Sequence, residues 1–288
     1  MHTITDALPL LPAALVDRLV DQALDEDWQE RGDITSQAVI PTEATAHAVI
    51  RAREAGVLAG LDLAEAAFRA HDSGLNVTRH KADGDRLAVD DDVVTITGSA
   101  QALLAAERVA LNYLGHLSGI ASTTARLVDT ISDTKAKICD TRKTTPGLRA
   151  IEKYAVRAGG AANHRFGLYD AILIKDNHIA VAGGIAAALD AAHAQANGVP
   201  IEIEIDTLAQ FEEALASGAQ IVLLDNMAPD MLRQAVALNK GRAVLEASGR
   251  VSAETVLAIA ESGVDYISVG ALTHSARTLD LGLDIDIS

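Results

Sequence analysis

The sequence predicts an α/β protein in which an α+β region precedes an incomplete or irregular (β/α) barrel. Short apolar runs recur in the second half of the chain, each ending in polar or charged residues, with helical segments between most of them. Equivalent positions in four of these runs follow one another at steps of 21, 21 and 22 residues, at Glu204, Asp225, Glu246 and Ser268. This rhythm implies parallel strands with helices outside them. An open doubly wound sheet is the alternative topology.

The first region combines helices with alternating strands. Residues 12–25 predict an amphipathic helix, because Pro12 suits a first helical turn and apolar residues recur at helical spacing. The other expected elements are a loop at 30–36, a strand at 44–53, a helix at 61–71 that ends near Gly74, and strands at 75–81 and 93–98. Together they predict helices packed on an antiparallel sheet.

A helical pattern resumes over residues 99–132, and Gly115 and Gly119 within it predict a break into two helices. Arg108 stands next to Glu107 beside the apolar stripe of this segment. A lone pair of this kind on a helix is usually a surface pair that contributes little to stability. The pattern alone therefore does not select Arg108 as a functional residue.

Six strands are expected in the second region. They lie at 137–141, 171–176, 201–206, 221–226, 243–248 and 266–270. A seventh strand is expected around Ala161 to His164. Because a complete barrel of this kind has eight strands, we expect the barrel to be incomplete.

Composition limits the class of protein. A hydrophobic content of 49% with 22% charged residues is that of a soluble globular protein. The formal net charge of -16 argues against a nucleic acid or an anionic membrane as partner. The single Cys139 excludes an internal disulfide and is expected to be a buried thiol. Since the sequence has no secretory signal pattern and no apolar run as long as a membrane span, we expect a cytoplasmic protein.

The stretch from Asp140 to His178 is locally basic. Between Arg142 and Lys175 seven basic residues are opposed only by Glu152 and Asp170, a surplus of five positive charges in an acidic chain. Guanidinium and ammonium groups of this kind hold carboxylates and phosphates. The alternative is a solvated basic face that pairs with acidic residues elsewhere.

Strand parity favours a functional interpretation of this stretch. In the strand at 201–206 the isoleucines share one face, which should pack on the helices, and Glu202, Glu204 and Asp206 share the other. An unpaired charge inside a barrel costs several kcal/mol, so these acids require cations, a metal or ligand hydroxyls. Lys175 and Asp225 are expected to point inward at the carboxyl ends of their strands, the end that carries the active site in barrels. Arg142, Lys143 and Glu246 are expected at the same end.

Two short loops that contain glycine follow the last two strands, at 247–250 and 269–272. Such loops often bind phosphate through backbone N–H groups. Several other chemistries have no motif here: the sequence lacks GxxxxGK[ST], GxGxxG, HExxH and any cysteine cluster.

The chain closely resembles the quinolinate phosphoribosyltransferase family. The matching segments are GDITS (32–36), AGVLAG (55–60), ERVALNYLGHLSGIA (107–121), DTRKTTPGLR (140–149), KYAV (153–156), GGAANHRFGLYDAILIKDNHI (159–179), EIE (202–204), LLDN (223–226), EASG (246–249) and ISVGALTHS (267–275). They cover most of the chain in the family's order. One departure is Arg250, where another glycine is common in the family.

The resemblance implies a homodimer with shared active sites. Each chain would have an N-terminal α/β sandwich domain at 1–117, completed by the tail 276–288, and a seven-stranded α/β barrel at 118–275. The implied reaction joins quinolinate to phosphoribosyl pyrophosphate (PRPP) and yields nicotinate mononucleotide, pyrophosphate and carbon dioxide. It belongs to de novo NAD biosynthesis and requires Mg²⁺.

The resemblance also implies roles for individual residues. Arg142, His164, Arg165 and Lys175 would supply cations to the two carboxylates of quinolinate, with Arg108 reaching in from the partner subunit. Lys143 suits the pyrophosphate, and Glu204 and Asp225 would accept from ribose hydroxyls and help hold Mg²⁺, partly through water and PRPP. Ser248, Gly249 and Gly270 would hold the 5'-phosphate, and Thr141 completes the substrate-binding set. Lys143, Lys175, Glu204 and Asp225 are the expected catalytic residues.

Three rival functions stay open at this point. A phosphoribosyltransferase for a mono-acid heterocycle would need fewer cations than the stretch from Arg142 to Lys175 provides. A sugar-phosphate aldolase would use Lys175 as a Schiff-base amine, which needs a lowered pKa, whereas inward acids should raise that pKa. The third rival is a non-catalytic protein that binds pyridine dicarboxylates.

Overall fold

Residues 8–287 are described by a computed structural model of the chain, and they fall into two compact units. One unit comprises Thr124–Arg149 and Ala161–His274. The other comprises the described residues up to Thr123, together with Ala150–Gly160 and the tail from Ser275. None of the described helices combines the length and the apolar content needed to cross a membrane.

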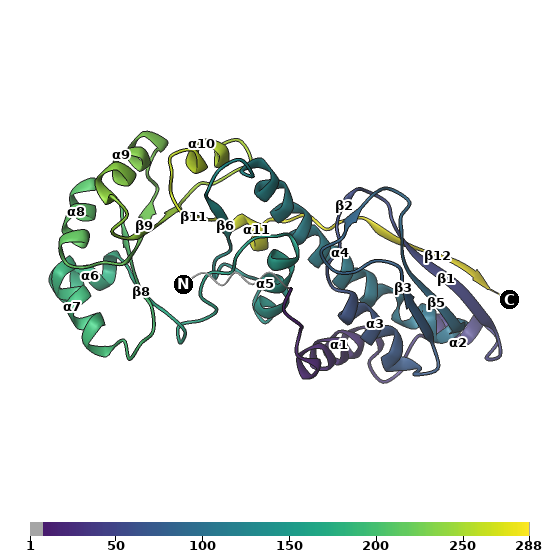
Figure 1. Ribbon diagram of the computed structural model, residues 1–288. Coiled ribbons are helices and arrows are strands. Elements are labelled where there is room, and N and C mark those ends of the chain that lie inside the picture. The colour runs from purple at the N-terminus through teal and green to yellow at the C-terminus, as the bar shows by residue number, and fades with distance from the viewer. Residues whose placement is uncertain (1–7, 288) are drawn as a thin grey trace. The chain divides into compact units, whose positions relative to one another are not determined.

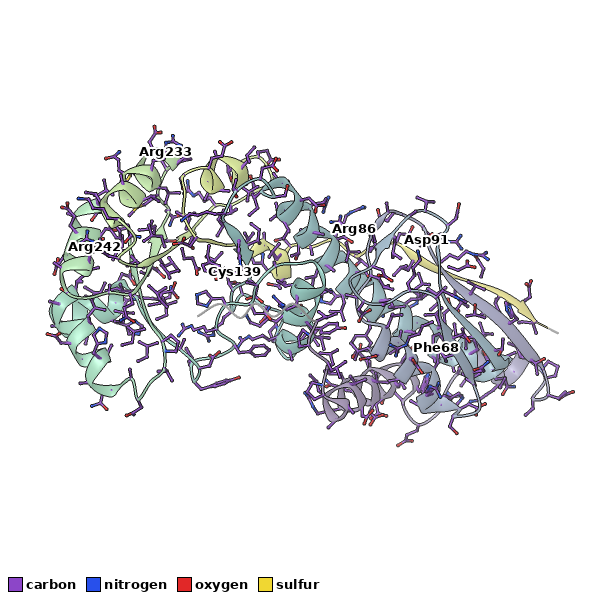
Figure 2. The ribbon with its side chains drawn as sticks, viewed as in Figure 1. Phe68, Arg86, Asp91, Cys139, Arg233 and Arg242 are labelled. Atoms are coloured by element: carbon purple, nitrogen blue, oxygen red, sulfur yellow. The ribbon has the colours of Figure 1, made fainter. Side chains whose placement is uncertain are left out.

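The unit formed by the N-terminal region and the tail contains an antiparallel sheet in the order β12-β1-β5-β3. Its strands are β1 (Thr45–Ala52), β3 (Asn76–Arg79), β5 (Asp92–Ser99) and β12 (Leu281–Ile287), and a small antiparallel ribbon joins β2 (Gly56–Val57) to β4 (Arg86–Leu87). The helices α1 (Ala13–Trp28) and α3 (Leu61–His71) pack against each other, and Phe68 of α3 is fully buried (Figure 2). These elements confirm the α+β character expected for this region.

The loop expected at 30–36 is wrong in its second half, because α2 begins at Ile34 and runs to Val39. The carboxylate of Asp33 accepts hydrogen bonds from the backbone N–H groups of Thr35 and Ser36 and so caps the first turn. An aspartate in front of a short polar segment is itself a helix-start signal, since it satisfies N–H groups that have no partner inside the helix.

The break expected at Gly115 and Gly119 is also wrong, because α4 is one continuous helix from Ala100 to Thr130. The two glycines instead allow the C-terminal tail to approach the helix closely. A Cβ on Gly119 would lie 2.0 Å from the carbonyl oxygen of Arg277, and the backbone N–H of Leu279 donates to the carbonyl of Gly115 at 2.9 Å. A glycine inside a helix therefore marks backbone contact here and not a helix end.

The second unit contains a six-stranded, all-parallel sheet in the order β6-β11-β10-β9-β8-β7. The strands are β6 (Lys137–Cys139), β7 (Ile172–Ile174), β8 (Ile201–Ile205), β9 (Ile221–Asp225), β10 (Val244–Ser248) and β11 (Tyr266–Ser268). All six lie within the ranges expected from the sequence. The helices of this unit are α6 (Asp176–Ala182), α7 (Ile185–Gln195), α8 (Leu208–Ala216), α9 (Pro229–Asn239), α10 (Val256–Ala260) and α11 (Ala271–His274). The helix α5 (Arg149–Ala158) lies between β6 and β7 in the sequence but belongs largely to the other unit.

The sheet curves into an incomplete barrel with α7, α8, α9 and α10 on its outer side (Figure 1). Ile203 and Ile205 are buried, and the thiol of Cys139 is fully buried at the end of β6 (Figure 2). The expected seventh strand is reduced to one parallel bridge, between Cys139 and Ala162. Within the described residues no strand pairing joins the segment around Ala162 to β7, so the expectation of an incomplete barrel is confirmed.

Candidate active site

The expected site residues of the barrel unit lie at the carboxyl ends of its parallel strands. Thr141, Arg142 and Lys143 follow β6, and Lys175 follows β7. Glu204 and Asp225 lie at the ends of β8 and β9, Ser248 and Gly249 at the end of β10, and Gly270 after β11. Because parallel strands bring their carboxyl ends to one edge, these residues share the edge at which barrel enzymes bind their ligands.

Arg142 and Arg165 form a pair of guanidinium groups with unused hydrogen-bonding capacity. The Nε of Arg142 is buried and has no hydrogen-bond partner among the described residues. Arg165 is also buried, and its guanidinium donates to one acceptor of the described chain, the carbonyl oxygen of Ala171 at 3.0 Å. Burial first, and the positive charge of Arg142 second, lower the pKa of Arg165. A buried cation beside a half-buried one with an unsatisfied buried donor suits an anionic ligand, whose oxygens would accept from these donors.

Lys175 forms an ion pair with Glu204 of the neighbouring strand β8. The backbone N–H of Lys175 donates to Nδ1 of His178 at 2.9 Å, which fixes the start of α6 directly behind the lysine. The terminal nitrogen of Lys175 is thus engaged with a carboxylate of its own chain, whereas a Schiff-base lysine must present its amine to the carbonyl of the substrate. The geometry therefore speaks against the aldolase alternative.

Glu204 and Asp225 supply carboxylate oxygens from the adjacent parallel strands β8 and β9. Both side chains are partly exposed, and the side-chain amide of Asn226 donates to Asp225 at 2.6 Å. Carboxylate oxygens are the protein ligands that Mg²⁺ prefers, usually with water and phosphate oxygens completing the shell. The donor set at this edge therefore fits Mg²⁺.

The two glycine loops each depend on a missing side chain. Gly249 has φ +93, and a Cβ there would lie 2.2 Å from Oδ1 of Asn226. A Cβ on Gly270 would lie 2.9 Å from Cδ of Lys143, so the lysine side chain rests against this glycine. Arg250 has φ 51, in the left-handed region that glycine adopts without cost, which explains why glycine suits this position better than arginine.

His164 lies inside the barrel between two buried glutamates. Its Nε2 is 2.9 Å from Oε2 of Glu202 on β8 and 3.6 Å from Oε2 of Glu246 on β10. Its Nδ1 accepts a hydrogen bond of 2.7 Å from the backbone N–H of Arg165, and its own backbone N–H donates to Asp140 at 2.8 Å. The sequence places Glu202 on the inward face but gives no role to it or to Asp140. The sequence signal that could have singled out Asp140 is its position, because it is an acidic residue directly after the strand β6.

Arg108 lies in the other unit, exposed on α4. Among the described residues no side chain or carbonyl forms an ion pair or a hydrogen bond with its guanidinium, and Glu107 is not paired with it. The surface pair that the sequence pattern indicates is therefore absent from the described part of the chain, and the guanidinium is available to another molecule.

We expect Glu246→Gln to stabilise the fold, by an amount that grows with pH. Burial first, and the negative charge of Glu202 second, raise the pKa of Glu246 well above its ordinary range. A glutamate in the unfolded chain has a pKa of about 4.3. Above that pH the unfolded chain loses this proton while the folded chain keeps it. The stability that Glu246 contributes is therefore fully present below the pKa of the unfolded chain and is lost as the pH rises through the raised pKa of the folded chain. Glutamine carries no such proton at any pH.

Urea denaturation of the wild type and of Glu246→Gln at pH 5 and pH 8 measures this effect, with Glu212→Gln, an exposed residue of α8, as the matched control. The free-energy advantage of Glu246→Gln should be larger at pH 8 than at pH 5. An advantage that is constant with pH would contradict the expectation.

The fold and this edge together define a class of protein: a two-domain α/β-barrel enzyme that acts on an anionic substrate and a phosphorylated one. Comparison with known sequences identifies the family. The N-terminal and C-terminal domain families described as quinolinate phosphoribosyl transferase match residues 33–118 and 120–284. The chain belongs to the quinolinate phosphoribosyltransferase family.

Relatives with assigned names agree with this membership. The chain is 47% identical over 259 residues to a protein of Bacillus subtilis named probable nicotinate-nucleotide pyrophosphorylase [carboxylating], with 89% of each chain covered. It is 45% identical over 273 residues to the nicotinate-nucleotide pyrophosphorylase [carboxylating] of Mycobacterium leprae, covering 92% of this chain and 95% of the relative. The solved structure of the nicotinate-nucleotide pyrophosphorylase from Francisella tularensis has a TM-score of 0.93 at 40% identity and covers 98% and 100% of the two chains.

The mono-acid alternative has a structural neighbour as well. The crystal structure of human nicotinic acid phosphoribosyltransferase matches with a TM-score of 0.61 and 13% identity, covering 96% of this chain and 74% of that one. A likeness at this level of identity shows a common fold and nothing more about substrate.

Proposed function

We propose that this enzyme transfers the phosphoribosyl group of PRPP to quinolinate with loss of carbon dioxide, giving nicotinate mononucleotide and pyrophosphate in de novo NAD biosynthesis. The relatives that cover most of the chain carry the name of this carboxylating pyrophosphorylase activity. The observation that carries the proposal is the pair of neighbouring guanidiniums, buried Arg165 and half-buried Arg142, of which Arg142 has a buried Nε donor that no described residue satisfies. Quinolinate, with two adjacent carboxylates, matches such a pair better than a mono-acid does.

In this proposal Arg142 and Arg165 bind the carboxylates of quinolinate, and the ammonium of Lys175 adds a third cation. The guanidinium of Arg165 is held in place by the hydrogen bond that it donates to the carbonyl oxygen of Ala171. Fixed cations orient the pyridine ring so that its nitrogen faces the anomeric carbon of PRPP. Quinolinate binding is thus assigned to the side of the site that follows β6 and β7.

PRPP is assigned to the other site residues of the same edge. Thr141 and Lys143 would bind the pyrophosphate, while Ser248, Gly249 and Gly270 would bind the 5'-phosphate with their loops. Glu204 and Asp225 would accept from the ribose hydroxyls, hold Mg²⁺ and stabilise the positive charge that develops on the ribose as pyrophosphate departs. When bound, Mg²⁺ neutralises charge on the departing pyrophosphate.

Decarboxylation follows from the chemistry of the ribosylated ring. Once the ring nitrogen carries ribose it is positively charged, so loss of carbon dioxide from the neighbouring carbon leaves an electron pair beside that charge, and a proton then takes the place of the carboxylate. The protein mainly holds the ring and excludes water during this step.

We also propose that the enzyme is a homodimer in which Arg108 completes the site of the partner subunit. The support is that Arg108 is an exposed guanidinium without an ionic partner among the described residues, in the unit that does not carry the other site residues. The family resemblance gives it this role.

The function is tested by the release of carbon dioxide from carboxyl-labelled quinolinate. Release is expected only when PRPP and Mg²⁺ are both present, because the ring must be ribosylated before it loses its carboxylate. Full-rate release without PRPP would contradict the proposal. Binding of quinolinate without any release under all conditions would favour the non-catalytic alternative, and trapping of a carbonyl substrate on Lys175 by borohydride would favour the aldolase.

A further inference from the structure

Both polar groups of the Lys143 backbone are held by threonine side chains. The segment that carries Lys143, residues 141–148, follows β6 and is neither helix nor strand. The backbone N–H of Lys143 donates to Oγ1 of Thr141 at 3.0 Å, and the carbonyl oxygen of Lys143 accepts from Oγ1 of Thr273 at 2.7 Å. Two hydroxyl groups thus fix the lysine backbone where no regular element does so.

Thr273 reaches Lys143 from the strand next to β6. The parallel pairing of β6 with β11 ends where Ser268 lies opposite Cys139, and one further backbone bond of 2.9 Å joins the N–H of Val269 to the carbonyl of Cys139. Thr273 lies in α11, just beyond β11, and only 3% of it is exposed. Its hydroxyl therefore continues the link between the two chain segments after their backbone pairing has ended.

The hydroxyl of Thr273 has one proton and two acceptors within reach. The carbonyl oxygen of Lys143 lies 2.7 Å from Oγ1, and the carbonyl oxygen of Gly270, three residues earlier in the same turn, lies 3.3 Å away. A threonine that only closed its own turn would bond to Gly270. The shorter distance gives the stronger bond to Lys143, so Thr273 serves a segment 130 positions away in the sequence.

The side chain of Lys143 is supported along its length and open at its end. A Cβ on Gly270 would lie 2.9 Å from Cδ of Lys143, so the aliphatic part of the lysine rests against that glycine. The residue is exposed, and its ammonium group forms no ion pair or hydrogen bond with any of residues 8–287. A cation whose backbone and stem are fixed before a ligand arrives loses less freedom when it binds.

We propose that Thr273 is a positioning residue that fixes Lys143 for binding the pyrophosphate group of PRPP. The inference rests on the proposed function, which assigns the pyrophosphate to Lys143 and the 5'-phosphate to the loop of Gly270. Because the Thr273 hydroxyl is used within the protein, Thr273 acts through Lys143. It joins the segment that binds one end of PRPP to the loop that binds the other.

A double-mutant cycle tests whether Thr273 acts through Lys143. Binding of inorganic pyrophosphate in the presence of Mg²⁺ is measured by calorimetry for the wild type, Thr273→Val, Lys143→Ala and the double variant. Valine keeps the shape of threonine and removes the hydroxyl, so Thr273→Val should weaken binding roughly 3- to 10-fold, because the ligand must then order the segment of Lys143. In the Lys143→Ala background the same change should have no further effect. Additive losses would overturn the proposal.

Quinolinate binding separates positioning from a general loosening of the site. Thr273→Val should bind quinolinate as the wild type does, and a loss as large as that for pyrophosphate would overturn the specific role. The matched control is Thr130→Val on α4, because the exposed Thr130 also donates to a backbone carbonyl at 2.7 Å, that of Arg126. This control should change neither affinity.

Thr273→Ser keeps the test decisive even if Thr273→Val does not fold. Serine retains the hydroxyl and loses only a methyl group, so Thr273→Ser should bind pyrophosphate with wild-type affinity. A folded Thr273→Ser that lost as much affinity as Lys143→Ala would overturn the proposal, because the hydroxyl would then not be what holds the lysine.

The positioning role and the proposed function fail in different ways. Release of carbon dioxide by the wild type tests the function without reference to Thr273, and the pyrophosphate cycle tests Thr273 without turnover. Coupled losses in an enzyme that releases no carbon dioxide from quinolinate would overturn the proposed function alone. Additive losses in an active enzyme would overturn the positioning role alone.

Discussion

Replacing Arg142 or Arg165 by alanine is expected to weaken quinolinate binding by about 2–5 kcal/mol, since each change leaves a desolvated carboxylate without its partner. The Nε of Arg142 is a buried donor that no described residue satisfies, so its bond to a ligand would replace no bond within the described protein, and the guanidinium of Arg165 is held by the carbonyl oxygen of Ala171. Calorimetric titration with quinolinate in the absence of PRPP measures the loss directly.

The variant to compare with these two is Asp225→Ala. This variant should keep nearly all of its quinolinate affinity while its turnover falls, because Asp225 is assigned to PRPP and Mg²⁺. Glu204→Ala is a less clean contrast, because it also removes the ion-pair partner of Lys175. Arg233→Ala, which breaks an exposed pair with Asp230 on α9, is the matched arginine control and should change neither quantity. If Asp225→Ala lost quinolinate and Arg165→Ala kept it, the two sides of the site would be assigned the wrong way round.

Mixing two inactive variants, Arg108→Ala and Lys175→Ala, is expected to restore roughly a quarter of wild-type activity under conditions that allow subunits to exchange. In a mixed dimer with shared sites, one site lacks both residues and the other has both. Random exchange makes roughly half of the dimers mixed, and each of them has one intact site of two. Release of carbon dioxide measures the recovery, and mass-tagged subunits measure the exchange.

The control for this experiment is a mixture of Lys175→Ala with Asp225→Ala. Both residues lie in the same barrel unit, so every site of every dimer lacks one of them and no activity should return. Confirmed exchange without recovery in the Arg108→Ala and Lys175→Ala mixture would mean that Arg108 serves its own chain or no site, and the shared site would be refuted.

The strands of the barrel and the edge that carries the site were predictable from the sequence because both depend on local periodicity. Side chains alternate between the two faces of a strand, so the isoleucines and glutamates of β8 separate into an outer and an inner set. The position at which an apolar run ends then places Lys175 and Asp225 at the carboxyl edge, whatever the rest of the chain does. The family resemblance added roles that periodicity does not contain, and Arg108 is the plainest case.

Contacts between residues far apart in the sequence decided the rest. Gly115 and Gly119 resemble helix breakers until the tail at Arg277 is seen to lie against them, and then they are what allows one continuous helix to accept that tail. The surroundings of His164 are another such case, because nothing in the local sequence indicates which groups its ring contacts. Only the fold brings Glu202, on a strand far along the chain, within hydrogen-bonding distance of its Nε2, while the backbone N–H of Arg165 donates to its Nδ1.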